Sequence, residues 1–164
     1  MLLLGGDPQE TEDVWRARAS VPGEIGTVLA ALTEPELIAE WAPVGFELEN
    51  PQATALHAGS HERVCGSIAG VKAFFDVDVA CAEPGRLELV ADGPLAMDVA
   101  WRFRAQRGRV VVDASIVLRH RGGLTAKILR GALVAVLNAG ALDRALLRLG
   151  ESLRPEGEPE PLAA

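Results

Sequence analysis

The stretch that decides the fold is LTAKILRGALVAVLNAGALDRALLRLGESL, at residues 124–153. Its apolar residues recur at helical spacing, so the stretch predicts one long amphipathic helix. A helix of 30 residues is about 45 Å long, which is more than one flat contact requires. We therefore expect this helix to lie across a curved sheet and to close one side of a cavity.

Alternating apolar and polar residues precede this helix and predict the sheet. Residues 10–21 predict a half-buried strand. Two short helices follow, at 25–32 and 37–41, and Pro35 suits the first turn of the second because it has no amide hydrogen to leave unpaired. Six further strands are predicted at residues 46–56, 60–68, 71–82, 86–91, 95–105 and 109–121. The fold class is therefore α+β, with a curved seven-stranded antiparallel sheet wrapped around the long C-terminal helix.

The last hairpin of the sheet can be placed in register. If Arg107 and Gly108 form a two-residue loop, Phe103 lies opposite Val112 and the large apolar residues of both strands share one face. Arg102 and Asp113 then lie opposite each other on the other face, as an exposed cross-strand pair. A slip of one residue would mix the two faces, so this register is strongly specified.

Composition excludes several classes of protein. The chain has 164 residues, a net charge of −7, and 49% hydrophobic but only 4% aromatic residues, which predicts one domain with an aliphatic core. The negative charge argues against a nucleic-acid partner, because such partners need clustered Lys and Arg. No apolar run reaches the ~20 residues that span a bilayer. Residues 1–4 are too short for a signal peptide, so we expect a cytoplasmic protein.

The domain is expected to cover residues 10–153. Residues 1–9 are a loose lead-in, and residues 154–164, rich in Pro and Glu, predict a disordered acidic tail. Cys65 and Cys81 lie on neighbouring strands but too far apart along them for a disulfide. They are expected as free thiols in a reducing compartment.

Several short stretches carry a family resemblance. SVPGEI at 20–25, LTEPEL at 32–37 leading to Trp41, and AGS at 58–60 resemble the START/Bet v 1-like (SRPBCC) superfamily, and within it the bacterial polyketide cyclase/dehydrase-like branch. GVKAFF at 70–75 resembles the carbon-monoxide-dehydrogenase branch of the same superfamily. The resemblance covers residues 10–153 and implies the helix-grip fold. Members of this superfamily include polyketide cyclases, lipid carriers, plant hormone receptors, co-chaperones and enediyne self-resistance proteins, so the fold alone does not choose a function.

The inward face of the sheet and helix is expected to be almost wholly apolar. Small residues alternate there with large ones, and because packed cores avoid voids, the remaining volume predicts space for a ligand. Trp and Met suit a flat or irregular hydrophobic guest. The predicted ligand-binding residues are Trp15, Ala17, Trp41, Val64, Phe75, Val77, Met97, Val99, Trp101, Ala114, Ile116, Leu129, Leu133 and Val136.

Two residues are candidates for catalysis, Glu62 and His120. The strand at 60–68 has two registers: Glu62, Val64, Gly66 and Ile68 face inward in one, and His61, Arg63, Cys65 and Ser67 in the other. The apolar pair Val64 and Ile68 favours the first. In the first register Glu62 is an acid inside an apolar cavity, where a raised pKa would suit acid–base work. The alternative is that Glu62 lies at the solvent-exposed end of its strand. His120 ends its strand near the cavity mouth, where it reaches the cavity, caps the long helix or is solvated.

On the strand at 71–82, Cys81 is expected on the inward face, whereas Asp76 and Asp78 face solvent. No two histidines have metal-ligand spacing, so neither a metal nor a cofactor is predicted.

Two functions remain open. The first is binding of a hydrophobic small molecule, a polyketide-type natural product or a lipid, as a carrier, sensor or self-resistance protein in secondary metabolism. The second is a polyketide cyclase or dehydratase. The chain is expected to be a monomer or a weak homodimer.

Overall fold

The computed structural model describes residues 13–42, 45–50, 54–119 and 122–155. The predicted lead-in, nearly all of the predicted tail and His120 lie outside these residues. In chain order the elements are β1 (Asp13–Pro22), α1 (Ile25–Thr33), α2 (Pro35–Trp41), β2 (Gly45–Leu48), β3 (His61–Ile68), β4 (Val71–Glu83), β5 (Arg86–Asp92), β6 (Ala96–Gln106), β7 (Arg109–Arg119), α3 (Leu124–Asn138) and α4 (Ala141–Ser152).

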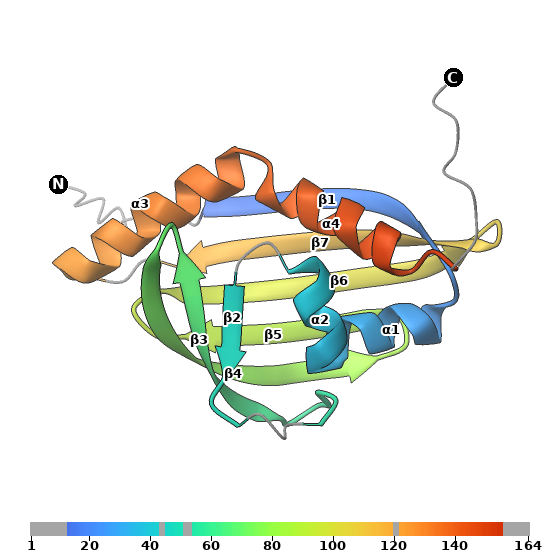
Figure 1. Cartoon of the computed structure of the whole chain (residues 1–164), viewed down its shortest axis with the longest axis horizontal. Coiled ribbons are helices and arrows are strands. Elements are labelled where there is room, and N and C mark those ends of the chain that lie inside the picture. Colours follow the sequence, from blue (N-terminus) through green and yellow to red (C-terminus); the bar gives the residue numbers. More distant parts are fainter. Residues whose placement is uncertain (1–12, 43–44, 51–53, 120–121, 156–164) are drawn as a thin grey trace, which may run out of the picture.

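The seven strands form one antiparallel sheet in the order β1-β7-β6-β5-β4-β3-β2. The sheet curls, and α3 and α4 lie along its open side while α1 and α2 cover one end (Figure 1). The strands alternate between an apolar inner face, which is turned toward the helices, and a more polar outer face. The predicted α+β fold class is confirmed.

The register predicted for the last hairpin is also confirmed. Phe103 pairs with Val112, and the turn residues Arg107 and Gly108 have φ angles of 52° and 75°, as a two-residue hairpin turn of type I′ requires. Arg102 lies opposite Asp113 on the outer face, as predicted, although the two side chains form no ion pair with each other. Asp113 is bound instead by Arg18 of β1, whose Nε lies 2.5 Å from Asp113 Oδ1.

The single C-terminal helix is corrected to two. α3 ends at Asn138 and α4 begins at Ala141, and Gly140 between them adopts a left-handed conformation with φ 90°. The helical spacing of buried residues runs through this break without a change of phase, because Leu133, Leu137, Ala141 and Ala145 are each four residues apart. Periodicity alone therefore predicts one helix.

Two strands depart from their predicted form. β2 ends at Leu48, well short of residue 56, and β4 has a bulge between Val79 and Cys81. The bulge reverses the two faces, so that Ala82 faces inward opposite Leu87 and Cys81 lies opposite Glu88 on the outer face. The inward placement of Cys81 is therefore wrong. Both cysteines are free thiols, as expected.

Candidate functional site

Two neighbouring rows of inward-facing side chains run across the strands β1, β7, β6 and β5. The closed row consists of Ala17, Ala114, Trp101 and Leu87, which are 8%, 2%, 4% and 1% exposed. The open row lies two residues further along the strands and consists of Trp15, Ile116, Val99 and Leu89, all only half-buried. Both rows belong to the inner face of the sheet, yet water reaches only the open row.

The helices explain this difference. α4 packs closely against β1 and α2, whereas α3 approaches the sheet mainly at β3. At the closed end, the Trp41 indole of α2 donates a hydrogen bond to the carbonyl oxygen of Ala31 at 2.8 Å. Its ring meets Trp101 edge to face, with ring centroids 5.2 Å apart. Helices α2 and α4 thus seal one half of the inner face, and α3 leaves the other half accessible.

Two polar contacts hold α3 against β1 at the open row. Trp15 Nε1 donates a hydrogen bond to Asn138 Oδ1 at 2.9 Å, and Arg130 forms an ion pair with Asp13. Gly140 ends this helix just beyond Asn138. α3 is therefore attached through a few defined contacts at one edge and a glycine at its end.

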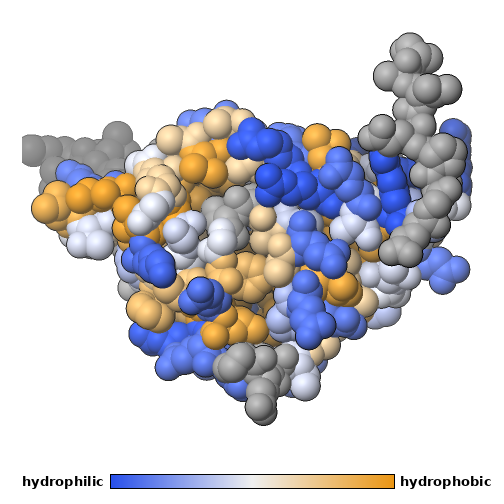
Figure 2. Space-filling model, viewed as in Figure 1, coloured by the Kyte–Doolittle hydropathy of each residue, from blue (hydrophilic) through white to orange (hydrophobic). Residues whose placement is uncertain are grey.

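On the face drawn in Figure 2, hydrophobic side chains gather at α3 and across the middle, between hydrophilic ones.

The predicted ligand-binding residues divide equally between the two environments. All of the sheet residues among them lie on the inner face. The half-buried ones are Trp15, Val64, Val77, Met97, Val99, Ile116 and Val136, and the buried ones are Ala17, Trp41, Phe75, Trp101, Ala114, Leu129 and Leu133. Trp41 and Trp101 belong to the packed closed end. The half-buried group is the one that a ligand can reach without rearrangement of the core.

Glu62 faces inward, so the first of the two registers for its strand is correct. It lies opposite Val77, and Ile68 on the same face is 4% exposed. The cross-strand row that contains Glu62 and Val77 continues through Ala91 and Met97, next to the open row. Glu62 itself is half-buried. A carboxyl group therefore stands at the β3 edge of the accessible apolar surface.

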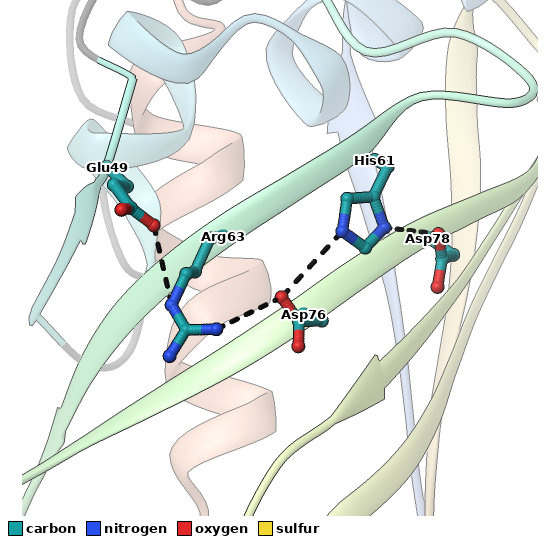
Figure 3. A network of polar contacts seen from close by, with 5 residues as sticks. All are labelled: Glu49, His61, Arg63, Asp76 and Asp78. Atoms are coloured by element: carbon teal, nitrogen blue, oxygen red, sulfur yellow. Dashed lines mark hydrogen bonds and ion pairs between the residues drawn. The ribbon is translucent and has the colours of Figure 1, made fainter.

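The outer side of the same strands carries a network of charged residues (Figure 3). His61 Nδ1 lies 2.6 Å from Asp78 Oδ1, and its Nε2 lies 3.7 Å from Asp76 Oδ1. Arg63 joins Asp76 at 3.5 Å and Glu49 at 3.4 Å. The hydrogen bond to Asp78, with its charge, raises the pKa of His61. Asp76 and Asp78 face outward as predicted, but the sequence did not reveal their partners.

Within the described ranges, no three His, Cys, Asp or Glu side chains come together in a way that would hold a metal ion. None of the described helices is both long and apolar enough to cross a membrane.

Comparison with known proteins places the fold. No family model and no curated protein matches the chain. Among solved structures, DynU16, a protein of the dynemicin biosynthetic locus, is 26% identical with a TM-score of 0.60 over 86% of this chain. The match covers 47% of DynU16, so this chain spans about half of that protein.

Two further structures share the architecture at lower identity. A START superfamily protein from Mycobacterium smegmatis is 13% identical with a TM-score of 0.61, over 86% of this chain and 99% of its own. Ara h 8.0201 is 10% identical with a TM-score of 0.57, over 87% and 98% of the two chains. The chain therefore has the helix-grip fold of the START/Bet v 1-like (SRPBCC) superfamily.

Proposed function

We propose that this protein binds a hydrophobic small molecule, a polyketide-type natural product or a lipid, between α3 and the inner face of the sheet. The observation that carries this proposal is the open row, where Trp15, Val99 and Ile116 remain accessible to water on the inner face of a curved sheet. Apolar surface that stays wet inside a fold gains free energy when a hydrophobic ligand covers it.

The surroundings of the open row favour a bulky apolar guest. Its side chains are aliphatic apart from Trp15, whose indole offers a flat surface and whose N–H is already bound by Asn138. The likeness to DynU16 supports a role in secondary metabolism, as carrier, sensor or self-resistance protein. We expect the protein to act in the cytoplasm, as a monomer or weak homodimer.

Thermal unfolding with an aromatic polyketide or a long-chain fatty acid tests the proposal, with native mass spectrometry to detect the complex. At a ligand concentration of about 100 Kd, a bound ligand should raise the Tm by about 5–10 °C. Val99→Trp, which fills the open row, should abolish this shift. Val117→Trp is the matched control, because Val117 lies on the outer face of the adjacent strand. Two results would refute binding at the open row: the ligand still raises the Tm of Val99→Trp, or no apolar compound raises the Tm of the wild-type protein.

A second function, cyclisation or dehydration of a polyketide intermediate, is favoured by one observation, the inward position of Glu62. A carboxyl group beside an apolar surface suits general acid–base catalysis. Glu62→Gln should then abolish conversion of a bound substrate, as followed by mass spectrometry, whereas the exposed Glu47→Gln on β2 should not. If the wild-type protein releases bound compounds chemically unchanged, or if Glu62→Gln alters only the affinity for them, the protein is a binder and not an enzyme.

A further inference from the structure

The outer face of the sheet concentrates positive charge in a chain that is acidic as a whole. Four strands, β1, β5, β6 and β7, project seven arginines outward: Arg16, Arg18, Arg86, Arg102, Arg104, Arg109 and Arg119. The same side of these strands carries four acids: Glu88, Asp92, Asp98 and Asp113. The outer side of these four strands thus has a surplus of three positive charges, and since the whole chain has a net charge of −7, the rest carries −10.

The surplus gathers at the end of the sheet near the β6–β7 turn. We call the five outward arginines that three strands contribute at this end the arginine surface: Arg16 and Arg18 of β1, Arg102 and Arg104 of β6, and Arg109 of β7. Asp113 is the one outward acid on the same rows of these three strands. The sequence hides this grouping, because strands far apart in the chain supply its members.

The arginine surface is hollowed. A depression of about 660 Å³ is lined by Arg16, Arg18 and Arg102 together with Asp113, Ser115 and Ala100. Ser115 and Ala100 lie side by side on β7 and β6, next to Arg16. Short side chains there leave a floor between longer guanidinium groups, so the surface offers a recess as well as charge.

The arginines that surround the recess are only partly neutralised. Arg18 is bound by Asp113, whose hydrogen bond raises the pKa of the guanidinium further, so Arg18 stays charged. Glu88 already accepts two hydrogen bonds from Arg86, at 2.9 and 3.0 Å, and Arg102 reaches it only at 3.4 Å. Arg16 has no ion-pair or hydrogen-bond partner among the residues that the structure describes. Arg16 and Arg102 therefore retain donors for another molecule.

We propose that the arginine surface binds an acidic α-helical segment of another protein. Arg16 of β1 and Arg102 of β6 lie on either side of β7 and two residues apart along the strands, roughly 12 Å, which matches acids two turns apart on one helix face. Arg favours such contacts because its planar fork binds a carboxylate through two hydrogen bonds. The binding energy comes from Arg16 and Arg102, with Arg18 held in place by Asp113.

A protein segment fits this surface better than a nucleic acid does. Asp113 lies in the middle of the surface and Glu88 at its edge, where each would repel a continuous phosphate backbone. The charge of −10 on the rest of the chain opposes the approach of a long polyanion. A short acidic helix meets Asp113 in the recess as well, but it avoids most of the repulsion from the rest of the chain because it contacts the recess alone.

The test is fluorescence anisotropy of a labelled helical peptide of repeated Glu-Ala-Ala-Ala units, which keep the acids on one helix face, at about 20 mM salt, where surface charges are weakly screened. The double variant Arg16→Gln/Arg102→Gln should weaken binding roughly ten-fold and leave the Arg18–Asp113 pair intact. Lys72→Gln/Lys127→Gln is the matched control, because it removes the same charge from exposed positions outside the arginine surface. The control should change affinity less than about two-fold.

Three results would overturn the proposal. The acidic peptide fails to bind, the control weakens it as much as the double variant does, or single-stranded DNA binds more tightly than the peptide and loses that binding in the double variant. The last result would assign the surface to a phosphate polyanion. Circular dichroism of both variants verifies that neither has unfolded. The outcome is independent of ligand binding at the open row, which lies on the opposite face of the sheet.

Discussion

The closed row and the open row are built from the same four strands, two residues apart, yet their environments differ. Trp101 is buried and meets Trp41 edge to face, whereas Val99 on the same strand is half-buried. The strands cannot account for this difference because they are continuous. The cause is what covers them: α4 and α2 on one side, α3 on the other. A sealed core and a water-accessible apolar surface therefore occupy separate halves of one sheet.

The largest effect that tests this comparison comes from two leucines of β5. Leu87 belongs to the closed row and Leu89 to the open row. Leu87→Ala should lower the free energy of unfolding by about 2–5 kcal/mol, since it leaves a cavity in a sealed core. Leu89→Ala should cost less than half as much, because water already reaches that side chain. Urea denaturation measures both, and equal losses would remove the distinction between the rows.

A smaller effect is expected at the border between the two halves, at Gly140. Its φ of 90° disfavours a side chain, although an added Cβ would have open space apart from an ordinary contact with Arg144 at 3.7 Å. Gly140→Ala should therefore cost roughly 1–2 kcal/mol through backbone strain alone.

The matched substitution is Gly131→Ala within α3, where an added Cβ meets nothing within 4 Å. It should stabilise the protein by roughly 0.5–1 kcal/mol, as measured by thermal unfolding. If both substitutions change the free energy of unfolding in the same direction, the two helices do not need a left-handed residue between them.

The smallest effect concerns the outer surface behind the open half, where Asp78 raises the pKa of His61. A raised folded-state pKa means that the folded protein holds this proton more tightly than the unfolded chain does. The pair's stabilisation is therefore complete below the ordinary pKa of 6.5 and is lost as the pH rises through the raised value. Asp78→Asn should flatten the part of the Tm profile that lies above the ordinary pKa of 6.5. A profile identical to that of the wild type would mean that the contact contributes nothing.

The sequence was sufficient for the architecture wherever the two faces of a strand differ in polarity. The β6–β7 register followed from Trp101, Phe103 and Val112 on one face and charged residues on the other. The bulge in β4 escaped prediction because Val79-Ala80-Cys81-Ala82 has small apolar residues on both faces. Likewise, one uninterrupted helical period hid the break at Gly140.

The candidate site was less predictable than the fold. Alternation placed Val99 and Trp101 on the same inward face, but it cannot tell which of them a helix covers. That depends on the distance between α3 and the sheet, which is a tertiary property. The orientation of Glu62 was open for a related reason, since Glu62 and Arg63 are both charged. It was decided by the pairing of Glu62 with Val77 of β4.

One consequence of the strand order concerns the synthesis of the chain. β1 is made early, but its partners are β7, which begins at Arg109, and α4, which begins at Ala141. At roughly 5–20 residues per second, β1 waits several seconds for its first partner strand to be translated. During that time its apolar face and its backbone edge lack their final neighbours. We therefore expect nascent chains to be the most aggregation-prone form of this protein. Co-expressed chaperones should then improve its yield more than substitutions that slow the unfolding of the folded protein.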